Sequence, residues 1–316
     1  MKDYYFGVDV GGTTIKMGLY SQKSGWVKKW EIPTRKENGG MYVLDDIAAA
    51  VYAAQQEFDL DNARTAGIGI GVPGPVLKKS IVNGCVNVGW DVVNVSEELG
   101  KRTELPVYVE NDANIAALGE QWKGAGKDYQ SVALLTLGTG VGGGIILDGK
   151  IVSGFQGGGG EVGHLPVVRD AVRSCNCGKA DCVELAGSAT GVLNCAKQLL
   201  SETDEPSAMR DIENLSAKDV CDCCAAGDAL AQKCIDRAAD ALGTALACIG
   251  CIVNPEAFLF GGGMAAAGDI LLEPIGRVYN AKVFPPLRGT PILQATLGNE
   301  AGITGAVRLV QIEQQA

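Results

Sequence analysis

The sequence predicts an α/β protein of two domains, and a pattern that occurs twice along the chain is the main reason. In residues 4–20 and again in residues 131–147, a buried strand runs into a glycine-rich turn and a second strand follows directly. A length of 316 residues is enough for two domains with substantial cores. We interpret the repeat as an internal duplication in which each copy opens one domain.

The N-terminal domain is expected to cover residues 1–115, completed by a C-terminal helix within residues 300–316. Period-two and helical patterns predict its elements in order. Residues 80–95 show neither period, so we expect a loop there that folds over a ligand. The predicted strands are 4–10, 15–20, 26–32, 66–72 and 106–109, and the predicted helices are 42–58, 113–122 and 301–311.

The larger C-terminal domain is expected to cover residues 116–299. Residues 188–253 are predominantly helical in pattern, with a helix cap expected at residues 214–216, and a further helix should run on from Asp269. Strands are predicted at 131–137, 145–147, 256–260 and 291–295. Two hairpins that grip the phosphates of a nucleotide between two domains are typical of the actin and hexokinase (ribonuclease H-like) architecture.

Each glycine turn is a candidate phosphate site because glycine leaves backbone N–H groups unobstructed. Asp9 ends the first strand and would place a carboxylate for magnesium. An ordinary hairpin turn is the alternative. The second turn also matches the dinucleotide pattern G-x-G-x-x-G, but a strand follows it where that site needs a helix, so we reject the match.

A cluster of cysteines with the chain's single histidine predicts a metal site. His164 is followed by Cys175, Cys177 and Cys182, a closed set of three thiolates and one imidazole that suits structural zinc. Alternatively, the cysteines are small core residues and His164 is a satisfied core histidine. A ring nitrogen bound to zinc would fix the direction of the other nitrogen toward a ligand hydroxyl.

Several polar residues are expected to hold or activate a sugar. Glu161 and Glu184 flank the proposed zinc cluster, so folding around the metal would bring both acids to one place suited to a polyol. Gly74 lies in a proline loop at the carboxyl edge of the sheet, where ligands favour binding. Asp112 stands between a strand and a helix, where it is either a helix cap or a general base.

Composition narrows the class of protein. With 27 Lys and Arg against 37 Asp and Glu, the net charge is −10, which argues against nucleic acid or an anionic membrane as a partner. The N-terminus has no signal-peptide pattern, and no apolar run reaches the roughly 18 residues of a membrane span. Eleven cysteines, an odd number, do not suggest a disulfide framework. A reducing cytoplasm is the expected location.

Taken together, these residues resemble the ROK family of sugar kinases and repressors over almost the whole chain. The motifs that carry the resemblance are residues 9–16 (DVGGTTIK), 110–114 (ENDAN), 137–144 (LGTGVGGG), 160–164 (GEVGH) and 175–184 (CNCG…CVE). The family's repressors carry a DNA-binding segment ahead of the first hairpin. Only eight residues precede Asp9, which argues against a DNA-binding repressor.

The resemblance implies ATP-dependent phosphorylation of a hexose, with Asp112 as the base on the 6-hydroxyl group and zinc on His164 and the three cysteines. It also implies a small-molecule hexose, ATP and Mg²⁺ as ligands, and a homodimer or homotetramer. The residues expected to bind the sugar are Gly74, Asn87, Asn111, Asp112, Glu161, His164 and Glu184. Those expected to bind ATP are Asp9, Gly11, Gly12, Thr13, Thr14, Lys16, Gly138, Thr139, Gly140, Gly262 and Gly263.

Within the family, residues 87–91 (NVGWD) and 188–191 (SATG) are similar to bacterial glucokinases. Glucose is therefore the expected substrate. Two alternatives stay open: a kinase of N-acyl hexosamines such as N-acetylmannosamine, which would share every motif above, and a sugar-sensing regulator without catalysis. The retained Asp112 argues against the sensor, because a sensor needs no base.

Overall fold

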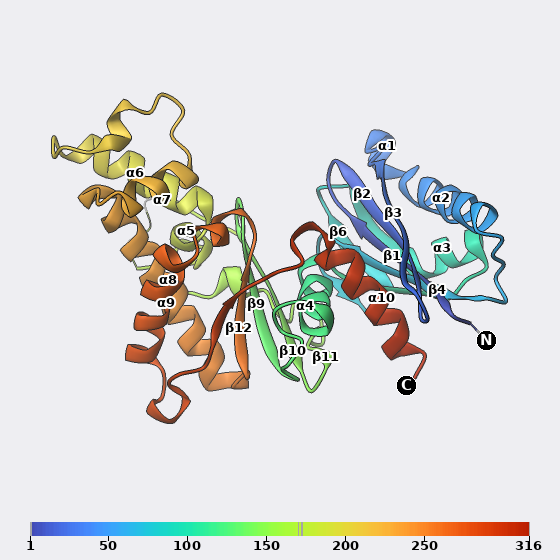
Figure 1. Ribbon diagram of the computed structural model, residues 1–316. Coiled ribbons are helices and arrows are strands. Elements are labelled where there is room, and N and C mark those ends of the chain that lie inside the picture. Colours follow the sequence, from blue (N-terminus) through green and yellow to red (C-terminus); the bar gives the residue numbers. More distant parts are fainter. Residues whose placement is uncertain (1, 170, 172, 316) are drawn as a thin grey trace. The chain divides into compact units, whose positions relative to one another are not determined.

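The computed structural model describes residues 2–169, 171 and 173–315, and its chain divides into two compact units (Figure 1). Unit 1 comprises Met1–Asp128, Gly144–Gly160 and Asn299–Ala316, and unit 2 comprises Tyr129–Gly143 and Glu161–Gly298. The boundary expected after residue 115 falls inside helix α4 (Asp112–Lys123). Helix α10 (Ala301–Glu313) belongs to unit 1, which therefore takes its chain from three separate segments.

A five-stranded sheet forms the centre of unit 1, in the order β3-β2-β1-β4-β8. β1, β2 and β3 form an antiparallel meander, whereas β4 is parallel to β1 and β8 is parallel to β4. All five strands were predicted and are confirmed. Their bounds are β1 Tyr4–Val10, β2 Thr14–Ser21, β3 Gly25–Pro33, β4 Thr65–Val72 and β8 Val107–Asn111.

A second five-stranded sheet has the order β11-β10-β9-β12-β13, and the chain passes from unit 2 into unit 1 within β10. When the strands of each sheet are numbered by their order along the chain, both sheets have the same spatial order: third, second, first, fourth, fifth. This shared order confirms the predicted duplication of the strand, glycine turn and strand. The bounds are β9 Val132–Leu137, β10 Val141–Leu147, β11 Lys150–Ile151, β12 Ala257–Gly261 and β13 Ile292–Gln294.

Helix α10 lies unusually close to the sheet of unit 1 because glycines face it. Gly7 on β1 and Gly69 on β4 are partners in register. A Cβ atom on Gly69 would overlap the carbonyl oxygen of Ala306, and one on Gly7 would overlap that of Ile303. The helix backbone can therefore rest directly on the two strands, which places the start of α10 near the end of β1.

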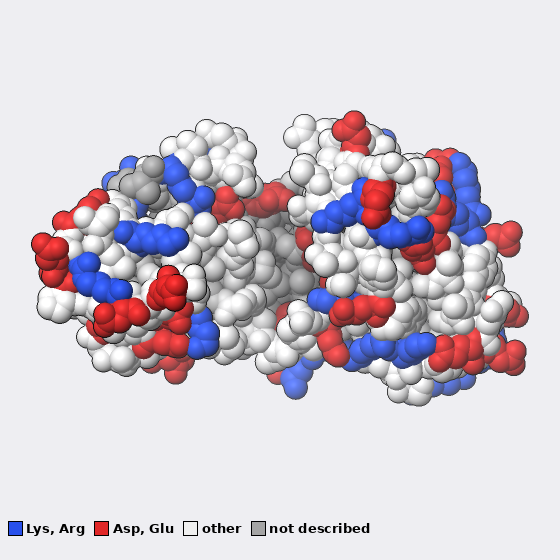
Figure 2. Space-filling view, turned by 90° about the horizontal axis from the view of Figure 1, so that it is seen from above, with Lys and Arg blue, Asp and Glu red and all other residues white. Residues whose placement is uncertain are grey.

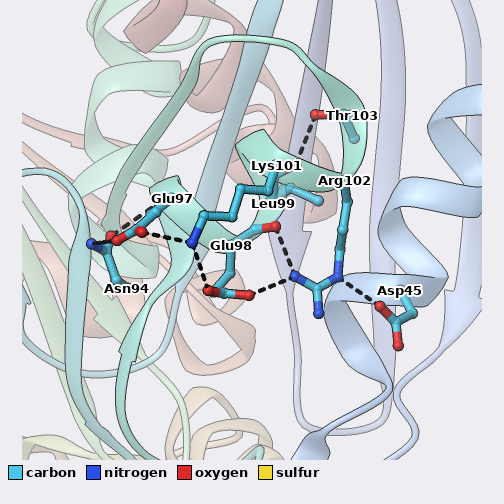
Figure 3. A network of polar contacts seen from close by, with 8 residues as sticks. All are labelled: Asp45, Asn94, Glu97, Glu98, Leu99, Lys101, Arg102 and Thr103. Carbon is cyan, nitrogen blue, oxygen red and sulfur yellow. Dashed lines mark hydrogen bonds and ion pairs between the residues drawn. The ribbon is translucent and has the colours of Figure 1, made fainter.

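The other helices of unit 1, α2 (Val43–Glu57) and α3 (Val95–Thr103), pack together beside the sheet, preceded by the short α1 (Glu37–Gly40). Buried Ile47, Val51 and Leu99 belong to the core they share with the strands. At the surface, Arg102 Nε on α3 donates to Asp45 Oδ1 on α2 at 2.6 Å (Figure 3). Such exposed ion pairs contribute little stability, so the apolar contacts dominate.

The prediction of a loop at residues 80–95 is wrong. The segment forms β6 (Ile81–Cys85) and β7 (Trp90–Asn94), which pair with β5 (Val76–Leu77) in a small antiparallel sheet. Val82 and Trp90 are among the residues that bury this sheet against the core, together with Val76, Cys85 and Val88. The strands have only two to five residues each, so their pairing could not be read from period alone. Asn87 lies in the turn between β6 and β7.

Unit 2 is mainly helical between its strands, as predicted. Ser216 caps α7 in a capping box with Asp219, within the predicted cap segment. The long α8 packs on α9, where a Cβ on Gly243 would meet Val278 at 2.6 Å. The helix bounds are α5 Glu184–Gly187, α6 Ala189–Glu202, α7 Ala217–Ala225, α8 Ala229–Val253 and α9 Asp269–Lys282, with 3-10 turns at Val162–His164 and Gly263–Ala267.

Charged side chains of both signs are mixed over the face drawn in Figure 2. None of the helices in the described part of the chain is long and apolar enough to cross a bilayer.

Candidate functional site

The first glycine turn joins β1 to β2 in unit 1. It is closed by a hydrogen bond from the N–H of Gly11 to the carbonyl of Thr14 at 3.0 Å. The hydroxyl of Thr34 donates to the carbonyl of Gly11 at 2.7 Å, which supports the turn from β3. A Cβ on Gly12 would stand 3.5 Å from Lys36 Nζ and 3.7 Å from Asn87 Cβ. The turn therefore lies beside a cation that the sequence analysis did not single out.

Asp9 lies at the end of β1, paired in register with Lys16. Burial raises the pKa of the Asp9 carboxyl above its usual range, and the charge of Lys16 offsets this only in part. A Cβ on Gly302, at the start of α10, would overlap the Asp9 carboxylate. The acid thus sits in a confined place where an additional cation would stabilise its charge.

The junction of β8 and α4 assigns different roles to two neighbouring residues. Asn111 is the helix cap, since its Oδ1 accepts the N–H groups of Ala113 at 2.9 Å and Asn114 at 3.1 Å. Its Nδ2 donates to the carbonyl of Gly74 at 3.2 Å. Asp112 is the first helical residue, with Oδ1 2.8 Å from the N–H of Ala113. The capping function proposed as the alternative for Asp112 therefore belongs to Asn111.

The second glycine turn, in unit 2, opens into a cavity of about 540 Å³. Gly138, Thr139 and Gly263 line this cavity together, so the predicted phosphate turn and a more distant glycine that is also expected to bind ATP share one space. Gly262 packs against the end of β9 with φ of 84°, a conformation that favours glycine. Lining residues that the sequence analysis missed are Ala189, Ser216, Ala217, Lys218, Cys221, Asp222, Met264, Ala266 and Ala267.

The four predicted metal ligands lie together in unit 2. One donor atom from each of His164, Cys175, Cys177 and Cys182 lies within 4.8 Å of the others. Cys175 Sγ is 3.6 Å from His164 Nδ1, and Cys177 Sγ is 3.4 Å from Cys182 Sγ. Zinc bonds of about 2.3 Å to sulfur and about 2.0 Å to nitrogen, arranged as a tetrahedron, require separations of roughly 3.5–3.8 Å. The donor set and its spacing therefore fit zinc.

Two thiols of this cluster, those of Cys175 and Cys182, have a raised pKa in the absence of a cation. Burial raises the pKa of Cys175 to about 12, helped by a hydrogen bond from its Sγ to Glu184 Oε1 at 2.8 Å. Burial also raises the pKa of Cys182, whereas the backbone N–H of Lys179 lowers that of Cys177. A bound divalent cation would displace the thiol protons, so metal binding at these four residues would be coupled to folding.

The expected sugar-binding acids surround this cluster. Glu161 Oε2 lies 3.9 Å from His164 Nε2, whereas Cys175 Sγ lies near the other ring nitrogen, Nδ1. Glu184 begins α5, and a Cβ on Gly140 would stand 2.7 Å from its Oε2. Unit 2 therefore brings Glu184 next to both the cysteine cluster and the second glycine turn.

The predicted residues thus form two groups, one in each unit. Unit 1 holds Asp9, Gly11, Gly12, Thr13, Thr14, Lys16, Gly74, Asn87, Asn111 and Asp112. Unit 2 holds Gly138, Thr139, Gly140, Glu161, His164, Cys175, Cys177, Cys182, Glu184, Gly262 and Gly263.

Comparison with known proteins places these features in one family. The family model described as the ROK family matches residues 5–313. The glucokinase of Halalkalibacterium halodurans is 42% identical over 318 residues, covering 99% of this chain and 96% of that protein. The glucokinase of Thermotoga maritima is 35% identical over 314 residues, covering 96% of each.

Solved structures agree with this match. The ROK hexokinase from Thermus thermophilus has a TM-score of 0.81 at 30% identity, covering 99% of each chain. The ROK family glucokinase from Streptomyces griseus, in complex with glucose and AMPPNP, has a TM-score of 0.76 at 32% identity, covering 98% of this chain and 99% of that chain. The hexokinase-like fold is thereby confirmed, and the chain belongs to the ROK family.

Proposed function

We propose that this protein is an ATP-dependent sugar kinase that phosphorylates the 6-hydroxyl group of glucose. The observation that carries the proposal is the full-length match to relatives named glucokinase, 42% identical in the first case. The AMPPNP and glucose in the related Streptomyces griseus structure favour the same pair of ligands here. Asn111 and Gly74 in unit 1, and Gly138, Thr139 and Gly263 in unit 2, support the proposal because the members of each set lie together.

In the proposed mechanism Asp112 accepts the proton of the attacking hydroxyl group. The geometry supports this role because the N-cap residue of α4 is Asn111 and not Asp112. Asn111 would hold the sugar together with Gly74 and Asn87 of unit 1. A general base of this kind contributes about 10² to 10⁴ in rate.

Residues of both glycine turns would position ATP. Backbone N–H groups at Gly11–Thr14 and at Gly138–Gly140 would hold phosphate oxygens, and the cavity beside Gly263 would take the adenosine. Asp9 would hold Mg²⁺, which supplies charge neutralisation at the phosphates when bound. Phosphoryl transfer depends mainly on such positioning and electrostatics.

Zinc on His164, Cys175, Cys177 and Cys182 would have an orienting function. Because Nδ1 faces the thiols, Nε2 faces Glu161 and is available for a sugar hydroxyl group. Four protein ligands leave no open position for a catalytic water, so this metal would be structural. Glu161 and Glu184 would accept further sugar hydroxyl groups.

We further propose a cytoplasmic location and a homodimer or homotetramer. Light scattering of the purified protein would test the oligomeric state. A kinase of N-acyl hexosamines remains the second candidate, since it would use the same residues and differ around the 2-substituent of the sugar.

The experiment that tests the function is a coupled ADP-release assay with Mg-ATP. The panel is glucose, N-acetylmannosamine, N-acetylglucosamine, mannose, fructose and allose. Turnover with glucose above the other sugars is the expected result. Preference for an N-acyl hexosamine would keep the mechanism and replace the substrate. No turnover, combined with thermal stabilisation by a sugar, would instead support a sensor.

A further inference from the structure

Glu110 is a buried carboxylate that the proposed mechanism does not use. It precedes Asn111 at the end of β8, and the residue is only 1% exposed. Oε1 accepts the N–H of Asn111 at 2.9 Å and Nδ2 of Asn114 at 3.2 Å, and Oε2 accepts the hydroxyl of Ser153 at 2.5 Å. All three partners donate, so the site is built for a carboxylate, which only accepts.

Charged side chains of both signs share a cavity with Glu110. Glu110 lines a cavity of about 250 Å³ in unit 1 together with Lys79 and Lys150. Lys79 is itself paired with Glu313. Charge-assisted hydrogen bonds to a buried carboxylate are short and strong, so the hydrogen bond from Ser153 should be stronger than one between two neutral groups.

Ser153 is the first residue of a glycine-rich loop, residues 153–159, that precedes the GEVGH motif. Its carbonyl accepts the N–H of Gly159 at 2.8 Å, which closes the loop. Gly157 has φ of 72°, and a Cβ there would overlap the carbonyl of Val76. The loop is therefore tied to Glu110 at its base and packed against the chain just after Gly74.

The same network includes the expected sugar-binding residues of unit 1. Asn111 Nδ2 donates to the carbonyl of Gly74 at 3.2 Å, while the N–H of Asn111 donates to Glu110. One carboxylate thus connects the loop, the strand end and the start of α4. A displacement of any one of these parts would be transmitted to Asn111 and its neighbour Asp112.

We propose that Glu110 and Ser153 are positioning residues that hold loop 153–159 and the Asn111–Asp112 junction in a fixed relation for sugar phosphorylation. This inference rests on the proposed kinase function. Neither residue needs to touch the substrate. Misplacement of reacting groups by about 1 Å can cost on the order of 10² in rate, so loss of the hydrogen bond between Ser153 and Glu110 should lower turnover.

The test compares Ser153→Ala with Ser96→Ala in the purified full-length protein. Ser96 is the matched control, because its part-buried hydroxyl donates to the carbonyl of Val107 at the other end of β8 at 2.7 Å. Ser153→Ala should lower kcat/KM for glucose about tenfold and leave KM for ATP within about twofold. Ser96→Ala should change neither. Both variants should unfold within about 3 °C of each other.

Hydrogen exchange measured by mass spectrometry separates failure of this inference from failure of the kinase function. Ser153→Ala should speed exchange in peptides covering residues 153–160, and Ser96→Ala should not. If exchange is faster in Ser153→Ala but the wild-type protein shows no turnover, the contact between Glu110 and Ser153 would be supported and the proposed kinase function rejected. Unchanged exchange in this loop, or equal activity losses in the two variants, would overturn the inference.

Glu110→Gln provides a second variant whose shape is conserved. Its amide can still accept from Asn111 and donate to the hydroxyl of Ser153, so the loss in kcat/KM should be smaller than for Ser153→Ala. The double variant should lose less than the two single losses combined, because both changes act on the contact between residues 110 and 153. Additive losses would show that the two residues act separately and would contradict the proposed pair.

Discussion

Cys175 Sγ lies 3.6 Å from His164 Nδ1, which turns the other ring nitrogen of His164 toward Glu161. This relationship gives the proposed zinc a function beyond stabilising a loop. A metal on the thiol side would fix the ring and with it the direction of Nε2.

Removal of zinc should therefore weaken sugar binding more than nucleotide binding. We expect one zinc per chain and, after chelation or in Cys177→Ser, an affinity for glucose lowered about tenfold or more, with AMPPNP affinity changed by less than about twofold. Metal analysis and isothermal titration calorimetry measure these quantities. Cys248→Ser, an exposed cysteine outside the cluster, is the control and should keep its zinc. An equal loss of affinity for glucose and for AMPPNP would point to unfolding.

Asp112→Asn should lower kcat by about 10² to 10⁴ while glucose still binds. Helix α4 should keep its stability, since Asn111 provides the cap. Steady-state kinetics, glucose titration and thermal unfolding check the three parts. Asp269→Asn is a matched control, because Asp269 is likewise the first residue of its helix, α9. A rate near that of the wild type in Asp112→Asn would rule out Asp112 as the base.

Asp9 should make stability and activity respond to pH in opposite directions. Because its folded-state pKa is raised above 3.8, protonation of Asp9 favours the folded state, and this stabilisation is lost as pH rises through the folded pKa. In the absence of Mg²⁺, Asp9→Asn should therefore gain stability relative to wild type as pH rises from about 4 to 7. With Mg-ATP present, the same variant should lose turnover. Urea unfolding across this range measures the difference. A constant difference at all pH values would contradict it.

The cavity beside Gly263 can be filled without disturbing the core. Ala266 lines the cavity and is exposed, so Ala266→Trp should raise KM for ATP about tenfold through the loss of space for adenosine. KM for glucose should stay within about twofold. Ala226→Trp, an exposed alanine outside the cavity in the same unit, should behave as wild type. An unchanged KM for ATP in Ala266→Trp would place the nucleotide elsewhere.

Local pattern was sufficient for much of the fold. The strands of the first sheet, the two hairpins and the helical region after the zinc ligands were predicted from period and turn residues, because such elements depend on neighbours in sequence. The small sheet β5-β6-β7 was missed. Its short strands gain their stability from pairing with one another and from buried Val82 and Trp90, and neither appears as a local period.

The sequence by itself determined the chemical groups of the candidate site, since the spacing of His164 and three cysteines and the motifs around Asp9 and Asp112 can be read along the chain. Only the tertiary structure decided which groups meet. It moved the capping role from Asp112 to Asn111, placed Lys36 beside Gly12, and joined Glu110 to Ser153 across 43 positions. Contacts between residues so far apart depend on how sheets and helices pack, and no local pattern encodes that packing.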